Sequence, residues 1–175
     1  LLIERLLEKK EKAEKFNQLM YIKSYLYRSE MRTLFITNFS SLKFPVITMS
    51  KIKNAGLEEL KEMRSDADHL EYFSLDAMEL VIWEYVSAYH VFRDFMERTS
   101  NYGMNTLFQD MIYILHFIQD VKLFKQANPD KPFIYEAQKH PYLKEKVRKI
   151  LGDGTQKFLD YMIEIKEKKP ELFYD

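Results

Sequence analysis

The fold is decided by a stretch in the middle of the chain, LDAMELVIWEYVSAYHVFRDFMER (residues 75–98). Apolar and aromatic residues recur in it at intervals of 4, 3, 4, 3 and 4, namely Met78, Ile82, Tyr85, Tyr89, Phe92 and Met96. That spacing is typical of a helix that packs against other helices. Ser74 precedes the stretch and Asp76 falls in its first turn, so we expect the helix to be capped by Ser74.

The spacing of apolar residues along the rest of the chain predicts an all-α fold. Four main helices are predicted, at residues 16–39, 75–98, 105–127 and 155–168. Short accessory helices are predicted at residues 57–70 and 141–151, with a connector at residues 40–56. Pro141 suits the first turn of its helix, and Gly152 suits the position after the last. Because 175 residues include only 4 Gly and 5 Pro, we expect an up-and-down helical bundle with a long N-terminal helix and no sheet.

Composition narrows the function classes. Hydrophobic residues make up 46% of the chain and charged residues 31%, which is typical of a folded protein. Cysteine is absent, so disulfides, thiolate metal sites and cysteine nucleophiles are excluded. The net charge is zero, and residues 66–120 contain ten acidic residues against Arg93 and Arg98. A nucleic-acid-binding protein normally concentrates basic residues on one face, so we expect no nucleic-acid partner.

The first residues, LLIERLLEKKEKAEK (1–15), combine an apolar start with a highly charged continuation. The apolar residues are Leu1, Leu2, Ile3, Leu6 and Leu7. From Glu8 to Lys15 only Ala13 is uncharged, so no face of this part of the helix can enter a core. We therefore divide the chain into a charged helical stalk next to a membrane, residues 1–15, and a single helical-bundle domain, residues 16–175.

Two interpretations of the apolar start remain open. No apolar run in the chain reaches the roughly 18 residues of a membrane-spanning helix, but the chain begins without methionine and inside a helical pattern. The first interpretation places a hydrophobic span of about 20 residues upstream of Leu1, so that the stalk leaves the membrane on its cytoplasmic face. The second pairs the five apolar residues with a second copy of the chain in a coiled coil.

Two histidine–aspartate pairs are the weak candidates for a metal site. His90 and Asp94 are four residues apart, as are His116 and Asp120 on the next predicted helix. Such pairs can chelate a divalent metal if they face each other. Both pairs fall on polar helix faces, however, where each aspartate is expected to pair with its own histidine. We therefore expect no metal, no cofactor and no catalytic residue; a metal- or small-molecule-binding helical-bundle enzyme that uses these four residues remains the alternative.

Trp83 lies close to the polar face of its predicted helix, beside Ser87 and His90. An exposed indole there would mark a contact surface for a partner, and a short accessory helix that covers it is the alternative. The 9 methionines and many aromatic residues fill the core in most bundles, although they could also line a ligand pocket.

Two segments resemble parts of a known group of proteins. They are LLIERLLEKKEKAEKFNQLMYIKSYLYRSEMRTLFITNF (1–39) and FLDYMIEIKEKKPELF (158–173). Both are similar to segments of uncharacterised bacterial proteins in which one or two N-terminal transmembrane helices precede a cytoplasmic all-helical domain. The resemblance implies a membrane anchor and a location at the cytoplasmic face of the membrane, and it brings no catalytic residues.

Together these features predict a non-catalytic cytosolic domain of a membrane-anchored bacterial protein that acts as an interaction or sensory module. The expected partners are the membrane, through a segment upstream of Leu1, and either another protein or a second copy of this chain, which would make a homodimer.

Overall fold

The computed structural model describes residues 1–28, 31–100 and 105–173, and it places the side chains of all of these except 25–28, 99–100 and 105–107. The described chain is 85% helical, which confirms the all-α class. In chain order its elements are α1 (Leu2–Arg28), α2 (Met31–Ser40), β1 (Leu42–Phe44), α3 (Met49–Asn54), α4 (Leu57–Asp66), η1 (Ala67–His69), β2 (Glu71–Tyr72), α5 (Leu75–Ser87), α6 (Tyr89–Ser100), α7 (Asn105–Ala127), α8 (Phe133–Lys139), α9 (Pro141–Arg148), η2 (Lys149–Asp153), α10 (Gly154–Lys168) and η3 (Pro170–Phe173).

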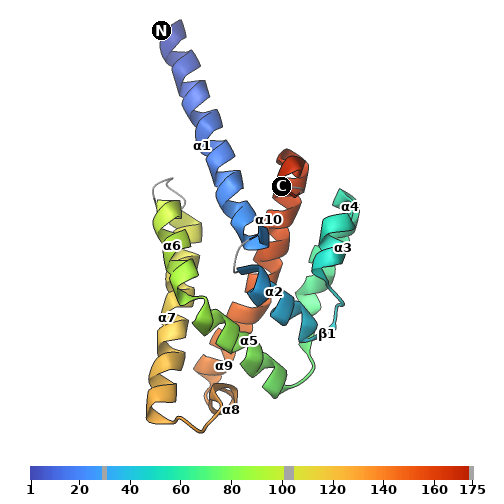
Figure 1. Ribbon diagram of the computed structural model, residues 1–175, viewed down its shortest axis with the longest axis vertical. Helices are drawn as coiled ribbons and strands as arrows, with labels where there is room; N and C mark the ends of the chain where they lie inside the picture. The colour runs from blue at the N-terminus through green and yellow to red at the C-terminus, as the bar shows by residue number, and fades with distance from the viewer. Residues whose placement is uncertain (29–30, 101–104, 174–175) are drawn as a thin grey trace.

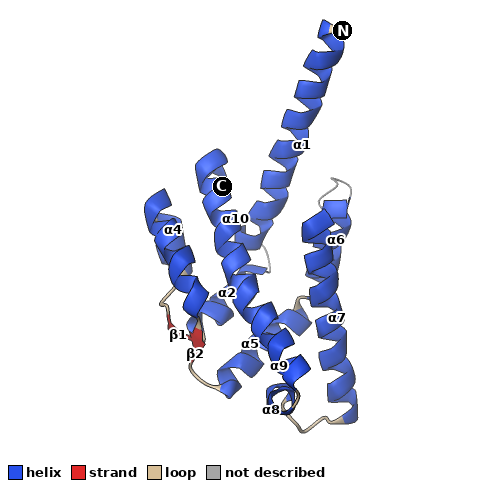
Figure 2. Ribbon diagram, turned by 180° about the vertical axis from the view of Figure 1, so that it is seen from behind, coloured by secondary structure: helices blue, strands red, loops and turns tan. Residues whose placement is uncertain are grey.

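Helix α1 stands apart from the rest of the molecule over its first half (Figures 1 and 2). Every side chain from residue 1 to residue 15 is exposed, Phe16 is half-buried, and Met20 is only 1% exposed. Glutamate and lysine favour helix on their own, and opposite charges four residues apart add to this. The stalk is therefore helical although it leaves the body, and its length is about 20 Å at 1.5 Å per residue.

Helix α10 lies in the middle of the body, with α1 and α4 packed against it (Figures 1 and 2). Its buried residues are Thr155, Phe158, Leu159, Met162 and Ile165. Phe158 stacks on Phe35 of α2, with the two ring centroids 4.0 Å apart. Helices from both ends of the chain thus share one core. The finer expectation, an up-and-down arrangement of four main helices, stays a prediction.

The predicted helix at residues 75–98 is two helices, α5 and α6, which meet at Ala88. The Ala88 N–H is shared between the carbonyls of Glu84 and Tyr85, at 3.0 and 3.2 Å. Helix α5 packs mainly on α2 and α8, whereas α6 packs mainly on α7 (Figure 1). The break follows from these different partners, because one straight helix could not lie along both. Of the predicted helix at residues 16–39, α1 as far as Arg28 and α2 from Met31 are described; the residues that would join them lie outside the described residues.

The expectation that the chain has no sheet is wrong at one place. Strands β1 and β2 form a two-stranded antiparallel ribbon in which Leu42 lies opposite Tyr72. Next to it, the Phe73 N–H donates to the Ser41 carbonyl at 3.0 Å. Strands this short carry no alternating apolar pattern, so the sequence did not indicate them. The ribbon joins the connector after α2 to the segment before α5.

Two predicted helix starts are confirmed. The Ser74 hydroxyl caps α5 by accepting from the Ala77 N–H at 3.1 Å. Pro141 occupies the first turn of α9, where its missing N–H costs no hydrogen bond.

The predicted helix end at Gly152 is wrong. Elements α9, η2 and α10 follow one another without interruption, and η2 is a π-helical turn. Ile150 and Leu151 in this turn are 3% and 0% exposed. The Thr155 hydroxyl donates to the Leu151 carbonyl at 2.9 Å. If the helix ended in this buried turn, backbone carbonyls would be left without hydrogen-bond partners. The helix therefore continues through the turn.

A partly buried ion pair joins α1 to α10. Lys23 is 7% exposed, and its ammonium lies 2.7 Å from a carboxylate oxygen of Glu164. The same ammonium lies over the ring of Tyr161, 5.1 Å from the centroid. Since Lys23 belongs to the part of α1 that enters the body, this contact fixes the stalk to the core helix.

We predict that Glu164→Ala will lower the free energy of unfolding by about 2 kcal/mol, because Lys23 then stays buried without its carboxylate. For a chain of this size the melting temperature, followed by circular dichroism, should fall by about 4–8 °C. Glu167→Ala removes an exposed carboxylate of the same helix and serves as the control. It should change stability by less than about 0.5 kcal/mol. Equal melting temperatures for both variants would show that the pair contributes nothing to stability.

Candidate functional site

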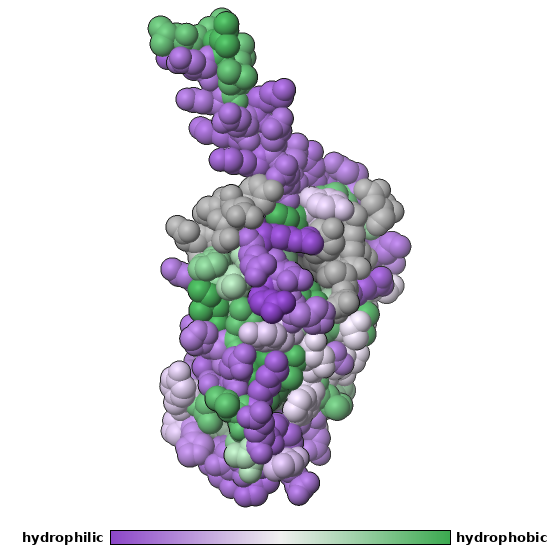
Figure 3. All heavy atoms as spheres, turned by 60° about the vertical axis from the view of Figure 1, so that its left-hand side comes forward, coloured by the Kyte–Doolittle hydropathy of each residue, from purple (hydrophilic) through white to green (hydrophobic). Residues whose placement is uncertain are grey.

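The exposed end of α1 is the first candidate site. Its apolar residues, which we call the tip, are between 54% and 97% exposed: Leu1, Leu2, Ile3, Leu6 and Leu7. Figure 3 shows this hydrophobic end separated from the body by a hydrophilic shaft. Contiguous exposed apolar side chains commonly mark an interaction surface. None of the helices in the described part of the chain combines the length and apolar composition required to cross a membrane.

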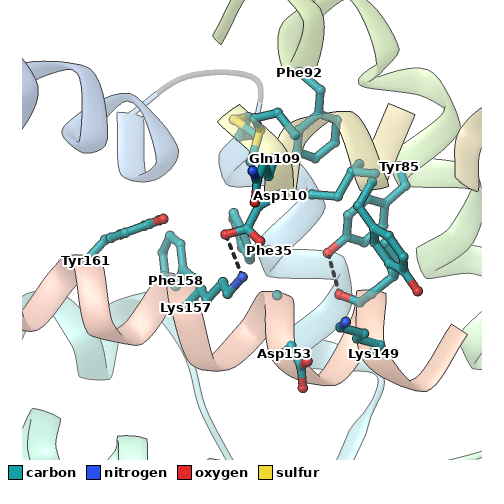
Figure 4. Close-up of a pocket in the computed structure, with 16 residues that line it drawn as sticks. Phe35, Tyr85, Phe92, Gln109, Asp110, Lys149, Asp153, Lys157, Phe158 and Tyr161 are labelled. Carbon is teal, nitrogen blue, oxygen red and sulfur yellow. Dashed lines mark hydrogen bonds and ion pairs between the residues drawn. The ribbon is translucent and has the colours of Figure 1, made fainter. Parts of the chain in front are cut away.

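The second candidate site is a cavity of about 260 Å3 in the body, partly open to solvent, which we call the aromatic cavity (Figure 4). Helices α2, α5, α6, α7 and α10 contribute to its walls. Its aromatic lining consists of Phe35, Tyr85, Phe92, Tyr113, Phe158 and Tyr161. Met31 and Met111 add flexible apolar side chains. An apolar cavity of about 150 Å3 already holds benzene, so this one can hold a small organic molecule.

An ion pair lies at the edge of the aromatic cavity. The ammonium of Lys157 on α10 is 2.5 Å from a carboxylate oxygen of Asp110 on α7. Figure 4 shows the Tyr161 hydroxyl turned toward the same carboxylate, whereas Asp153 points away from the rings. Burial, and to a smaller extent the charge of Asp110, raise the pKa of Tyr161, so its hydroxyl stays protonated. The edge of the cavity therefore carries the neutral ion pair of Asp110 and Lys157 and the protonated hydroxyl of Tyr161, which can donate a hydrogen bond.

Tyr85 and the π-helical turn η2 form another wall of the cavity. Tyr85 is 1% exposed, and its hydroxyl donates to the Ile150 carbonyl at 3.3 Å (Figure 4). Burial raises the pKa of this hydroxyl well above its ordinary value. A Cβ atom added at Gly154 would lie 2.7 Å from the Tyr85 oxygen. Because Gly154 has no Cβ atom, the Tyr85 hydroxyl has room beside it.

The four weak metal candidates are not brought together. The ammonium of Lys146, a buried residue, lies 2.9 Å from a carboxylate oxygen of Asp120. The expected pairing of Asp120 with His116 is therefore wrong, because a lysine from α9 supplies the partner. His90, Asp94 and His116 are exposed. Within the ranges that the structure describes, no three histidine or acidic side chains are grouped closely enough to hold a metal ion.

Trp83 is half-buried and takes part in contacts within the chain. Its indole N–H donates to Glu79 at 3.2 Å, and the Lys125 ammonium lies 5.5 Å from its ring centroid. The Glu79 carboxylate also accepts from the N–H groups of Phe133 and Ile134 at 2.9 and 2.8 Å. Trp83 and Glu79 together connect α5 with α7 and with the start of α8.

Sequence patterns did not single out the aromatic cavity. Tyr85 and Phe92 belong to the predicted helix seam, which they do occupy, but nothing in their spacing showed a void beside them. Asp110 and Lys157 lie on helices far apart in the sequence, so no local motif links them. The available signal was Gly154, since a glycine inside a helical pattern weakens it by about 1 kcal/mol and often marks a close approach.

No known protein family matches this chain, and no curated protein or solved structure matches it either. The function is therefore argued from the tip and the aromatic cavity themselves.

We predict that the effect of Gly154→Ala on stability changes sign with the residue at position 85. In the unchanged protein the new methyl group meets the Tyr85 oxygen at 2.7 Å, and overpacking of this kind costs about 1–3 kcal/mol. In the Tyr85→Phe background the next nearest atom is the Tyr85 Cζ, at 4.0 Å, an ordinary contact. The substitution should then stabilise by up to about 1 kcal/mol through helix propensity. Urea unfolding of the four proteins measures both effects.

Gly56→Ala is the control for this cycle. No atom lies within 4 Å of a Cβ added at Gly56, so its effect should be the same with tyrosine or phenylalanine at position 85. If Gly154→Ala also had the same effect in both backgrounds, the Tyr85 hydroxyl would not be what requires the glycine.

Proposed function

We propose that the chain is a non-catalytic cytosolic helical module of a membrane-anchored bacterial protein, with an interaction or sensory role. In this proposal α1 connects the body to the cytoplasmic face of the membrane. The body is an up-and-down bundle in which α5 and α6 together make one of the four main helices. The observation that carries the proposal is the exposed apolar tip at the end of a solvent-exposed stalk.

The tip has the form of an attachment surface. At about 100° per residue, its members other than Leu1 fall within an arc of about 140°, so they make a stripe along one side of the helix. The other side carries Glu4, Arg5 and Glu8. Amphipathic helices bury stripes of this kind in the membrane interface or against a partner helix.

The free energy gained by burying the tip decides whether the tip alone can anchor the chain. Burying one exposed aliphatic side chain is worth about 1.5–3 kcal/mol, and parts of these side chains are already shielded. The whole tip is therefore worth on the order of 5 kcal/mol, which corresponds to a dissociation constant of about 0.1–1 mM. Such binding is reversible, and stable anchoring needs a second element. The proposal therefore includes a hydrophobic span of about 20 residues upstream of Leu1.

The body offers a separate surface for a protein partner. Phe44, Val46 and Phe73 are between 58% and 64% exposed, and they lie on or next to the β1–β2 ribbon. Exposed apolar side chains that are close in the fold favour a protein–protein contact. In the absence of a membrane, the tip would pair with the tip of a second copy and make a homodimer.

We predict that a variant with glutamine at four tip positions will lose at least about tenfold of its affinity for lipid vesicles. Its changes are Leu2→Gln, Ile3→Gln, Leu6→Gln and Leu7→Gln. Glutamine favours helix, and these side chains are exposed, so helicity and melting temperature should stay unchanged. Co-sedimentation with vesicles that contain about 30% phosphatidylglycerol measures binding, and light scattering reports any dimer.

The matched control replaces two exposed leucines of the body, Leu80→Gln and Leu123→Gln, which are 63% and 62% exposed. It should bind vesicles as the unchanged chain does. Equal binding by the tip variant would contradict the membrane role. A dimer that disappears in the tip variant, in a chain that never bound vesicles, would assign the tip to a second copy instead. A lowered melting temperature would mean that the tip belongs to the core.

A further inference from the structure

We propose that the aromatic cavity binds a small uncharged aromatic molecule of one or two fused rings that carries an N–H or O–H donor. The inference rests on the proposed function in one respect, since it names the ligand of a sensory module. The cavity itself lies in the body and is separate from the tip.

The volume of the cavity limits the part of a ligand that it can bury. Its volume of about 260 Å3 exceeds the space of about 150 Å3 that holds benzene, so a second fused ring fits. Drug-sized molecules occupy pockets of roughly 300–1,000 Å3. The cavity therefore suits a ring system of about the size of phenol or indole.

The walls favour an aromatic ring over an aliphatic group. Tyr85 and Phe92 are parallel to within 3°, with centroids 5.5 Å apart, and Phe35 and Phe158 stack at 4.0 Å on another side. Rings of a ligand can meet these by stacking or edge contacts at centroid distances of about 4.5–7 Å. The lining thus offers ring faces and ring edges together, an arrangement that a flat ligand can use.

The charges at the edge favour a neutral ligand with a donor. Asp110 and Lys157 form an ion pair, and the other two charged residues of the lining, Lys149 and Asp153, are also of opposite sign. The charges of the lining therefore sum to zero, and an ionic ligand would lose its hydration for no net attraction. A carboxylate has about four acceptor positions, and Lys157 occupies one. Asp110 can therefore accept a further N–H or O–H from a ligand whose ring lies among the aromatic side chains.

A second hollow, of about 520 Å3, lies beside β2 and α9 and fits this role less well. Among the residues around it, the guanidinium of Arg148 and the carboxylate of Glu145 lie 2.5 Å apart. The aromatic side chains of this lining are Tyr72 and His69, so it offers a flat ligand fewer ring faces than the first cavity does.

Tyr161 connects the aromatic cavity to the stalk helix. Its ring lies 5.1 Å below the ammonium of Lys23, the residue that pairs with Glu164 and fixes α1 to the body. A ligand that stacks beside Tyr161 therefore contacts the joint between body and stalk. Through this contact, binding of a ligand in the cavity can alter the packing of α1 on the body.

Indole is the probe for the test. The full chain, labelled at its methionine methyl groups, is titrated with indole and followed by NMR. We expect saturable shifts, at submillimolar indole, of Met31 and Met111, which line the cavity. Met49 and Met63 lie outside the lining and should not respond. The absence of shifts at millimolar indole, or saturable shifts at Met49 and Met63 instead, would overturn the proposal.

Two matched variants on α7 test the location. Ile114→Trp fills the cavity and should weaken indole binding at least tenfold, whereas Leu123→Trp adds the same ring at an exposed position and should leave binding unchanged. Equal binding by both folded variants would overturn the site. If Ile114→Trp fails to fold, the methionine shifts of the unchanged chain still decide.

Two related molecules test the chemistry. Benzothiophene has the shape of indole without the N–H and should bind about tenfold more weakly, because it cannot donate to Asp110. Indole-3-acetate adds a negative charge and should also bind more weakly. Equal or tighter binding of either molecule would contradict the donor or the neutrality that we propose.

Vesicle co-sedimentation of the same samples keeps the two proposals apart. Methionine shifts without vesicle binding would support the cavity and contradict the membrane role. Vesicle binding without methionine shifts would contradict the cavity and leave the membrane role standing.

Discussion

Burial of the apolar side of α10 is the constraint on which the rest of the structure depends. Phe158, Leu159, Met162 and Ile165 are each 0–1% exposed. Removing such side chains from water is worth about 1.5–3 kcal/mol apiece, more than the ion pairs on the surface contribute. Helices α1 and α4 each cover a part of this helix, and α2 adds the Phe35–Phe158 stack. Segments that are distant in the sequence are held together because they share this one surface.

Within that core, a short chain of buried polar groups fixes how the segments are placed. The Tyr72 hydroxyl donates to the Asn38 side-chain oxygen at 2.7 Å, and the Asn38 amide donates to the Thr155 hydroxyl. Thr155 in turn donates to the Leu151 carbonyl. Apolar packing alone tolerates sliding, whereas a buried amide or hydroxyl that loses its partner costs the whole penalty of its desolvation. The chain therefore sets the position of β2, α2 and the π-helical turn relative to one another.

The two candidate sites differ in their exposure to solvent and in their distance from the core. The tip is exposed and lies at the end of the part of α1 that stands outside the core, so a contact made by the tip need not disturb the body. The aromatic cavity is lined by residues of five helices, and its shape depends on close approaches such as that of Gly154 to Tyr85. The contact between Lys23 and the ring of Tyr161 connects the stalk helix to the aromatic cavity. A sensory role requires such a connection, because ligand binding must alter contacts at the output element.

The sequence by itself determined the helical class, the capping of α5 by Ser74, and the exposed charged stretch of α1, because periodicity, capping and charge runs act over a few neighbouring residues. Tertiary structure decided the break at Ala88, the continuation of the helix through Gly152, the β1–β2 ribbon and the pairing of Asp120 with Lys146. It also decided the aromatic cavity, whose walls come from helices distant in the sequence. Local rules do not reach these features, because each is set by which distant segment lies alongside, and that is fixed only when the whole core is buried.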